Sequence, residues 1–481
     1  MNLDKPLRRV SIFALVLILA LMININYIQG SQAEKLQKDP LNNRQFLDIL
    51  NRDRGRIMAG GKELAFSQRT GRSDRKFQRR YSDPEVFAPV TGYFAASGST
   101  TLVEHSANDM LDGTDDRLAV RRWFDSFVGK PAKGANVETT INPQAQRVAY
   151  NALNNSTNRR GAAVVMDVKT GAIVVMATYP SYDTNDVVTN DTKKADQAFR
   201  RLGRADFQPM VNKAMNDTFP PGSAFKIVIA AAALESGLNK DSQIDTPSVY
   251  VLPGGHPLPN SHEGGACGAG AASLIAAFAE SCNTTFAKLG AEQLGGAKVD
   301  ALAGEFGYGK RTEVESDVRS AASELPPEHD RGTMALASIG QGDNRATPLQ
   351  MAMVAAAAAN DGKIMKPYLI DQVKSADQSV LYEAGPQQLA EPISSDTAGQ
   401  LQDMMRAVVT TGTANNLAGR NVAGKTGTAE TGRAFNDRWF VGFSPVNNPR
   451  YAFAVVTEGP GSGATSAGPV AATIMQAVLS R

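Results

Sequence analysis

The chain has 481 residues, of which 42% are hydrophobic and 20% charged, a composition typical of two or three globular domains. Its 50 Lys and Arg residues nearly balance its 48 Asp and Glu residues, and the formal net charge of +2 gives no reason to expect a nucleic-acid partner. Only four histidines occur in the sequence, so a Ser-His-Asp triad or a histidine-bound metal would have few residues to draw on.

An apolar stretch from Val10 to Ile28 follows several basic residues at the N-terminus. Crossing the hydrocarbon core of a bilayer takes roughly 20 residues, so this stretch is long enough. We predict a transmembrane signal anchor over residues 10–30. Because basic flanks stay in the cytoplasm, residues 1–9 form a cytoplasmic tail and the rest is exported. A cleaved signal peptide is the alternative, since Ser31-Gln32-Ala33 offers a small-x-small cleavage site.

Residues 31–136 are predicted to form a small extracytoplasmic module. They are polar up to about residue 80, with turn signals at Asp83-Pro84 and Asp112-Gly113. A basic cluster in this module is typical of a solvated surface, with binding to a partner or an anionic wall polymer as the alternative. The cluster consists of Arg72, Arg75, Lys76, Arg79 and Arg80.

From residue 137 onward the pattern predicts strands at both ends of one large domain and helices between them. The predicted strands are 137–141, 162–166, 172–177, 438–443 and 451–457, and the predicted terminal helices are 143–153 and 469–479. We therefore expect residues 137–481 to form a single domain of the α/β (α+β) class.

Ser223 and Lys226 lie at the start of an almost wholly apolar segment that continues to Leu234. Pro220, Pro221 and Gly222 break the chain just before it, which predicts a buried helix with Ser223 at its N-terminus. Residues three apart share a helix face, so Lys226 would lie beside the Ser223 hydroxyl. Apolar surroundings lower the pKa of an amine and make it a usable base. A serine that merely caps a helix is the structural alternative.

Ser281-Cys282-Asn283 stands between two helix-like segments and is predicted to be a short turn. If that turn is extended, Ser281 and Asn283 present a hydroxyl and an amide to a common space. Cys282 and Cys267 are the only cysteines in the sequence, and outside the cytoplasm a disulfide between them is permitted. Two free, buried thiols are the alternative.

Lys425-Thr426-Gly427-Thr428 is predicted to lie on a strand. There Gly427 would allow close approach of a backbone or ligand, and the hydroxyls of Thr426 and Thr428 could bind a carboxylate. Lys425 would add positive charge and would help to keep Lys226 deprotonated, because like charges depress each other's pKa.

Gly419 to Thr426 also fits the phosphate-loop pattern G-x-x-x-x-G-K-[ST]. That pattern requires a buried strand before it and a helix after it, and the sequence predicts neither, so we reject nucleotide binding. His262-Glu263 begins a zinc-protease motif, but position 266 is Ala, and the motif fails.

Ser-x-x-Lys, Ser-x-Asn and Lys-Thr-Gly, in this order, resemble the motif set of penicillin-binding proteins and class A β-lactamases. Arg54-Gly55-Arg56-Ile57 resembles a short motif near the start of class B penicillin-binding proteins, and the likeness extends from about residue 40 to the end. The resemblance implies a transpeptidase domain with an antiparallel sheet flanked by helices. It also implies that the N-terminal module is of the pedestal or dimerisation kind.

The resemblance also implies residue roles in a D,D-transpeptidase. Ser223 would be acylated by a stem peptide or a β-lactam, and Lys226 would take its proton. Ser281, helped by Lys425, would protonate the leaving D-Ala, and Asn283 would bind the substrate amide. Backbone N–H groups of Ser223 and Thr428 would form the oxyanion hole.

The resemblance implies no cofactor, metal or nucleotide. As partners it implies a membrane glycosyltransferase of the SEDS type and division proteins. Two other functions stay open at this point. One is a D,D-carboxypeptidase or β-lactamase, which shares the motifs, and the other is a β-lactam sensor or divisome scaffold.

Overall fold

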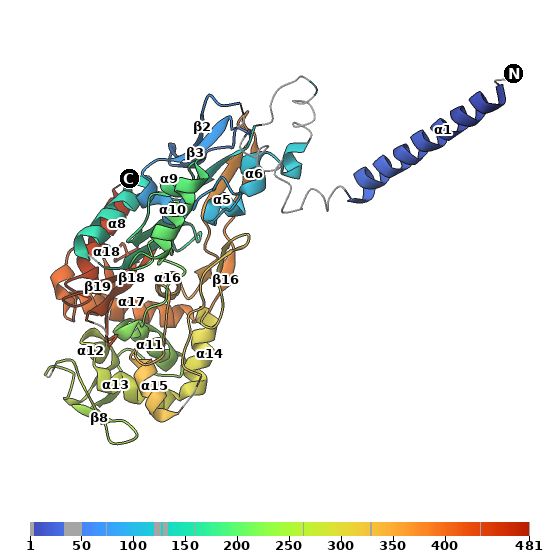
Figure 1. Cartoon of the computed structure of the whole chain (residues 1–481). Helices are drawn as coiled ribbons and strands as arrows, with labels where there is room; N and C mark the ends of the chain where they lie inside the picture. The colour runs from blue at the N-terminus through green and yellow to red at the C-terminus, as the bar shows by residue number, and fades with distance from the viewer. Residues whose placement is uncertain are drawn as a thin grey trace.

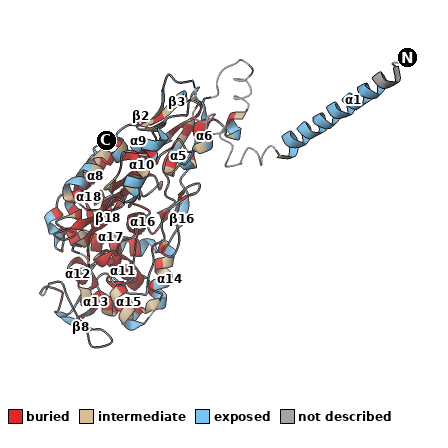
Figure 2. Ribbon diagram, in the orientation of Figure 1, coloured by how far each residue is buried: buried red, intermediate tan, exposed pale blue. Residues whose placement is uncertain are grey.

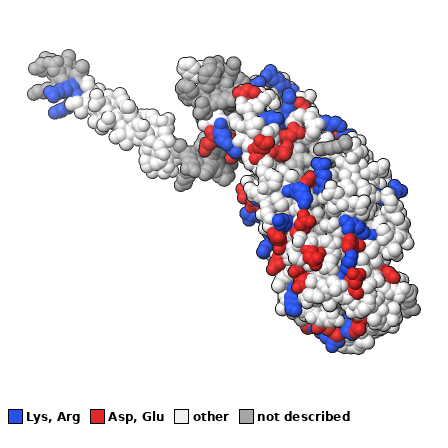
Figure 3. Space-filling model, turned by 180° about the vertical axis from the view of Figure 1, so that it is seen from behind, with Lys and Arg blue, Asp and Glu red and all other residues white. Residues whose placement is uncertain are grey.

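The computed structural model describes residues 4–32, 51–73, 75–119, 127, 133–157, 159–262, 264–327, 330–432 and 434–480. The chain begins with helix α1 (Asp4–Tyr27), which continues as a short π-helix, η1 (Ile28–Gln32) (Figure 1). Within Arg8–Gln32, an 18-residue window has a mean hydropathy of 2.3, and none of the 25 residues is buried. In Figure 3 this helix is white apart from its basic start, while acidic and basic side chains intersperse over the rest of that face. By length and composition, α1 can therefore cross a membrane.

The centre of the molecule is a five-stranded antiparallel sheet of order β17-β18-β19-β5-β6. Its strands are β5 (Gly161–Asp167), β6 (Ile173–Tyr179), β17 (Ala423–Ala429), β18 (Asn436–Ser444) and β19 (Tyr451–Gly459). All nine residues of β19 are buried, because helices cover both faces of the sheet. Strands from the two ends of the domain thus meet in one sheet flanked by helices, which confirms the predicted fold class.

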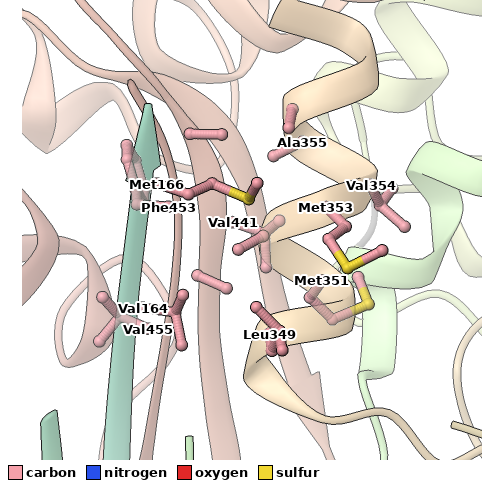
Figure 4. Packing of buried hydrophobic residues seen from close by; sticks show 14 of the residues in the cluster. Val164, Met166, Leu349, Met351, Met353, Val354, Ala355, Val441, Phe453 and Val455 are labelled. Carbon is pink, nitrogen blue, oxygen red and sulfur yellow. The ribbon is translucent and has the colours of Figure 1, made fainter. Parts of the chain in front are cut away.

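Helices α8 (Pro143–Ser156) and α18 (Ala467–Leu479) pack together on one face of this sheet, and α16 (Pro348–Ala359) packs on the other (Figure 1). Every residue of α16 is buried, and Figure 2 shows the same for most of the surrounding core. Leu349 and Met353 of α16 lie on the side of the sheet toward which Val441 points (Figure 4). A helix that is apolar all round in this way belongs to a core.

A second, six-stranded sheet has the order β15-β14-β4-β1-β2-β3. β1 and β4 are parallel, and the other neighbours are antiparallel. Its strands are β1 (Ile57–Ala59), β2 (Lys62–Arg69), β3 (Phe77–Tyr81), β4 (Asn136–Thr139), β14 (Ile370–Lys374) and β15 (Val380–Glu383). The predicted domain boundary at residue 136 falls at the start of β4, and two strands from beyond residue 370 extend the sheet of the N-terminal module.

Short helices complete the N-terminal module: α4 (Pro84–Thr91), α5 (Leu102–Ser106), α6 (Asn108–Asp112) and η2 (Asp116–Leu118). Glu104 of α5 is fully buried between Arg54, whose Nε lies 2.8 Å away, and Arg79, whose Nε lies 2.6 Å away. Tyr81 donates a further hydrogen bond of 2.9 Å to Glu104. The prediction that the basic cluster is a solvated surface is therefore wrong for Arg79. The alternation of side chains along β3 turns Arg79 into the core, where the buried carboxylate of Glu104 compensates its charge.

Most of the helices and short hairpins between β6 and β17 form the other end of the molecule, whereas the two helices within residues 184–203 lie beside the N-terminal module (Figure 1). The helices are α9 (Thr184–Val187), α10 (Thr192–Gly203), η3 (Gly222–Phe225), α11 (Lys226–Glu235), α12 (Leu274–Ala279), α13 (Asn283–Lys288), η4 (Leu289–Leu294), α14 (Gly296–Phe306), α15 (Arg331–Ser338), α17 (Ser395–Thr410) and η5 (Asn415–Leu417). The short strands are β7 (Gln243–Thr246), β8 (Val249–Val251), β9 (Pro257–Pro259), β10 (Gly270–Ser273), β11 (Glu313–Glu315), β12 (Val318–Arg319), β13 (Ile364–Met365) and β16 (Gln388–Ala390).

Candidate active site

Ser223 lies in the 3₁₀ turn η3, one turn before helix α11, rather than at the N-terminus of the α-helix as predicted. The residue that precedes α11 is Phe225, and the Ser223 side chain caps neither helical segment. The predicted buried helix does follow, with nine of its ten residues buried. Gly222, the first residue of this turn, adopts a φ of 53°, a conformation that favours glycine. The half-buried Ser223 hydroxyl is thereby left out of helix capping.

The Ser223 turn packs directly against strand β17. A Cβ atom on Gly222 would lie 2.5 Å from the Thr428 carbonyl oxygen, and one on Gly427 would lie 2.6 Å from that of Pro221. Trp439 of the neighbouring strand donates a 2.9 Å hydrogen bond to the Pro220 carbonyl. Gly427 therefore admits a close backbone approach, and that backbone belongs to the Ser223 turn.

Lys226 joins the first two motifs in the interior of the protein. Its amine is completely buried and donates hydrogen bonds to the Ser281 carbonyl (2.7 Å), Ser281 Oγ (3.2 Å) and Asn283 Oδ1 (2.7 Å). Burial lowers the pKa of Lys226 well below its ordinary value, and the charge of Lys425 lowers it further. Hydrogen bonds thus tie Lys226 to the Ser281 turn, and none joins its amine to the Ser223 hydroxyl.

The Ser281 turn connects α12 to α13, as predicted, but its backbone is not extended. Ser281 has a φ of 63°, in the left-handed region, and Cys282 is the N-cap residue of α13. Ser281 and Asn283 nevertheless face a common space, because both side chains accept from the Lys226 amine. Cys282 forms the predicted disulfide with Cys267. This bond ties the turn to the loop that precedes β10.

Lys425, Thr426, Gly427 and Thr428 lie on β17, an edge strand of the central sheet, as predicted. The Lys425 amine is fully buried, and it donates a 3.2 Å hydrogen bond to the Thr426 carbonyl. Burial lowers the pKa of Lys425 to about 7. The phosphate-loop pattern that ends at Thr426 runs into this strand, and the next element is another strand, β18, so the fold of a phosphate loop is not formed.

A cleft of about 250 Å³ opens between these elements. Predicted site residues on its wall are Ser223, Ser281, Asn283, Thr426, Gly427 and Thr428, while Lys226 and Lys425 lie buried behind it. Wall residues that were not singled out as site residues are Ser261, Ile339, Gln341, Thr413, Glu430, Ser462, Gly463 and Ala464. Gln341 and Glu430 belong to segments next to recognisable motifs and could have been found that way, whereas Thr413 carries no sequence signal.

One His/Cys/Glu group among the described residues has its ligand atoms within 4.8 Å of one another: His262, Cys267 and Glu280. The sulfur of Cys267 is bonded to Cys282 in the disulfide and therefore offers no thiolate. This set of side chains does not fit a metal ion.

The cleft combines a serine on its wall, a buried lysine of lowered pKa and two further polar motifs. This arrangement is that of an enzyme that transfers an acyl group through a serine. The family model for the penicillin-binding protein transpeptidase domain matches residues 161–476, and the model for the penicillin-binding protein A dimerisation domain matches residues 54–137. The chain belongs to the penicillin-binding protein transpeptidase family.

Similar proteins align with almost the whole length of this chain. It is 37% identical to the peptidoglycan D,D-transpeptidase PbpA of Mycolicibacterium smegmatis, over 99% of this chain and 98% of that protein. It is 34% identical to the protein of the same name from Mycobacterium tuberculosis, over 99% of both chains. The structure is similar to that of M. tuberculosis penicillin-binding protein A in a ceftriaxone acyl-enzyme complex, with a TM-score of 0.85 over 90% of this chain and 100% of that one.

Proposed function

We propose that this protein is a peptidoglycan D,D-transpeptidase that crosslinks stem peptides through an acyl-enzyme on Ser223. The observation that carries the proposal is the convergence of the three motifs on one cleft, with two buried lysines of lowered pKa behind it. The names of the similar proteins, PbpA D,D-transpeptidases, support the same reaction.

Acylation begins with Ser223 Oγ attacking the carbonyl between the two D-alanines of a stem peptide. Lys226, as the neutral amine favoured by its burial, takes the hydroxyl proton. The backbone N–H groups of Ser223 and Thr428 stabilise the oxyanion, which is supported by the packing of the Ser223 turn on β17. As the peptide bond breaks, Ser281 passes a proton, with the help of Lys425, to the departing nitrogen, and free D-Ala leaves.

Deacylation reverses these steps with a different nucleophile. The amine of a neighbouring stem attacks the acyl carbonyl, its proton passes to the base, and the Ser223 hydroxyl is restored as the new peptide bond forms. Asn283 binds the substrate amide, and the hydroxyls of Thr426 and Thr428 bind its carboxylate, while Gly427 between them lets the Ser223 turn pack against β17. A β-lactam acylates the same oxygen by opening its ring.

The proposal places the catalytic domain outside the cytoplasm, with α1 as a single-pass anchor in the cell membrane. The basic residues before the apolar stretch and the disulfide both support this topology. Because transpeptidation joins peptides and does not polymerise glycan, the proposal also includes a separate glycosyltransferase of the SEDS type and division proteins as partners. Co-purification of such a glycosyltransferase with the full-length chain from crosslinked membranes tests this part.

Intact-mass measurement after incubation with benzylpenicillin tests the central claim. The expected result is a stable adduct of one penicillin on the wild-type protein and none on Ser223→Ala. An adduct on both proteins, or on neither, would show that Ser223 is not the nucleophile.

A further inference from the structure

Thr413 lies outside the three motifs, and yet it contacts strand β17, which carries one of them, and the end of α12, which leads into another. It follows helix α17 in the segment Thr411-Gly412-Thr413, and its half-buried side chain lines the cleft. The sequence shows no feature that distinguishes it from the threonines at 410 and 411.

The backbone of this segment docks on the end of α12, two residues before Ser281. The Thr413 N–H donates a 3.1 Å hydrogen bond to the Ala279 carbonyl. Gly412 allows this approach, because a Cβ atom at that position would lie 2.3 Å from the same carbonyl oxygen. The position of Thr413 is therefore set by the element that leads into the Ser281 turn.

The side chain of Thr413 reaches the opposite wall of the cleft. Its Oγ1 lies 2.7 Å from Oγ1 of Thr426 on β17, a hydrogen bond in which either hydroxyl can be the donor. Thr413 thus connects the end of α12 to the strand that carries Lys425 and Thr426.

We propose that Thr413 is a positioning residue, which donates its proton to Thr426 Oγ1 and so directs the Thr426 hydroxyl proton toward the carboxylate of the bound substrate. A hydroxyl has a single proton, so when Thr426 donates to a carboxylate, its oxygen is free to accept from Thr413. Hydrogen bonds in such a chain polarise and strengthen one another. This inference rests on the proposed function, in which Thr426 binds the carboxylate.

The test compares Thr413→Val, which removes the hydroxyl and keeps the shape, with Thr413→Ser, which keeps the hydroxyl. Acylation of the full-length protein by benzylpenicillin is measured over a range of concentrations, so that the binding constant and the acylation rate constant separate. We expect Thr413→Val to weaken binding roughly tenfold, with a much smaller change in the rate constant, and Thr413→Ser to restore binding. Thr411→Val is the matched control, because Thr411 is exposed and its hydroxyl donates only to the Ala407 carbonyl of its own helix.

A double-mutant cycle separates positioning from a general structural role. If Thr413 acts through Thr426, the double variant Thr413→Val/Thr426→Val binds no more weakly than Thr426→Val alone. Fully additive losses, or wild-type binding by Thr413→Val, would overturn the inference. So would a Thr413→Val protein whose melting temperature and acylation rate constant both fall while its binding constant does not. If the proposed function itself fails, the wild-type protein shows no acylation at Ser223, an outcome distinct from all of these.

Discussion

The amine of Lys226 donates a 2.7 Å hydrogen bond to Asn283 Oδ1 and a second bond of 2.7 Å to the carbonyl of Ser281. Both oxygens can only accept, and a neutral amine has only two N–H groups. In the neutral amine these two bonds use both donors, and the third contact, with Ser281 Oγ at 3.2 Å, then falls to the lone pair; the Ser281 hydroxyl accepts from the charged amine and can donate to the neutral one. This arrangement suits the neutral form that burial favours, and it makes Asn283 an orienting group for the base as well as a candidate substrate ligand.

The first prediction concerns the pH dependence of acylation. Lys226 must be neutral to act as a base, so the acylation rate falls as pH drops through its lowered pKa. Lys425, with a pKa of about 7, is charged below neutral pH and lowers the pKa of Lys226. Lys425→Met should therefore raise the pKa of Lys226 and move the acid limb of the rate profile to higher pH, in addition to slowing acylation. The measurement is the second-order rate constant for benzylpenicillin between about pH 5 and 9, and an unmoved acid limb would contradict the coupling of the two lysines.

The second prediction concerns the disulfide between Cys267 and Cys282, which are 15 residues apart. In the chain-entropy model a loop of this size stabilises a protein by about 3 kcal/mol. We expect the double variant Cys267→Ala/Cys282→Ala to lose stability of this order in urea denaturation. We also expect it to acylate more slowly, because the Ser281 turn loses its link to the neighbouring loop.

Reductant provides the control for this prediction. It should destabilise the wild-type protein and leave the double variant unchanged. A double variant with wild-type stability and wild-type acylation would mean that the bond holds neither the fold nor the turn.

Local sequence signals predicted the elements of the central sheet and of the site well, because each rests on neighbouring residues. The short, continuous apolar runs around Val164 and Val455 indicate buried strands, since both are rich in β-branched residues and too short for a typical helix. Long-range contacts could not be predicted in this way. Nothing near Arg79 shows that Glu104 will lie beside its guanidinium, and nothing near Thr413 shows that Thr426 will be its partner. The left-handed turn at Ser281 was missed for the same reason: Lys226, which bonds to it, lies 55 residues away.

The third prediction concerns the buried ion network of the N-terminal module. Glu104→Gln would leave Arg54 and Arg79 buried without an anion, which typically costs about 3–5 kcal/mol. Glu63→Gln is the matched control, because the pair that Glu63 forms with Arg56 is largely exposed and should contribute less than about 1 kcal/mol. Urea denaturation of both variants measures the difference, and equal losses would contradict the role given to burial.

The same network predicts a loss of stability in acid. Burial alone would raise the pKa of Glu104, but the guanidinium groups of Arg79 and Arg54 lower it below the ordinary value of 4.5. A carboxylate with a lowered pKa stabilises the fold above pH 4.5, and this stability is lost as pH falls through the pKa of the folded state. Denaturation of the wild type at neutral pH and in steps below pH 4.5 should therefore show a fall that Glu104→Gln lacks. Parallel pH profiles for the two proteins would contradict this assignment.

The last prediction tests how closely the Ser223 turn must pack on β17. An alanine at position 222 would be strained by the φ of 53° and would also collide with the Thr428 carbonyl, 2.5 Å from its Cβ. The collision pushes Ser223, the proposed nucleophile, away from the strand that bears the proposed oxyanion-hole N–H, and a displacement of about 1 Å can slow a reaction roughly 100-fold. Gly237→Ala is the matched control. Gly237 has a φ of 97°, and a Cβ atom added there would have no atom within 4 Å, so this variant is strained but makes no collision. We expect Gly237→Ala to lose about 1 kcal/mol of stability with unchanged acylation, and Gly222→Ala to lose acylation by at least about tenfold. If both variants acylate at the wild-type rate, contact between the turn and β17 does not set the position of Ser223.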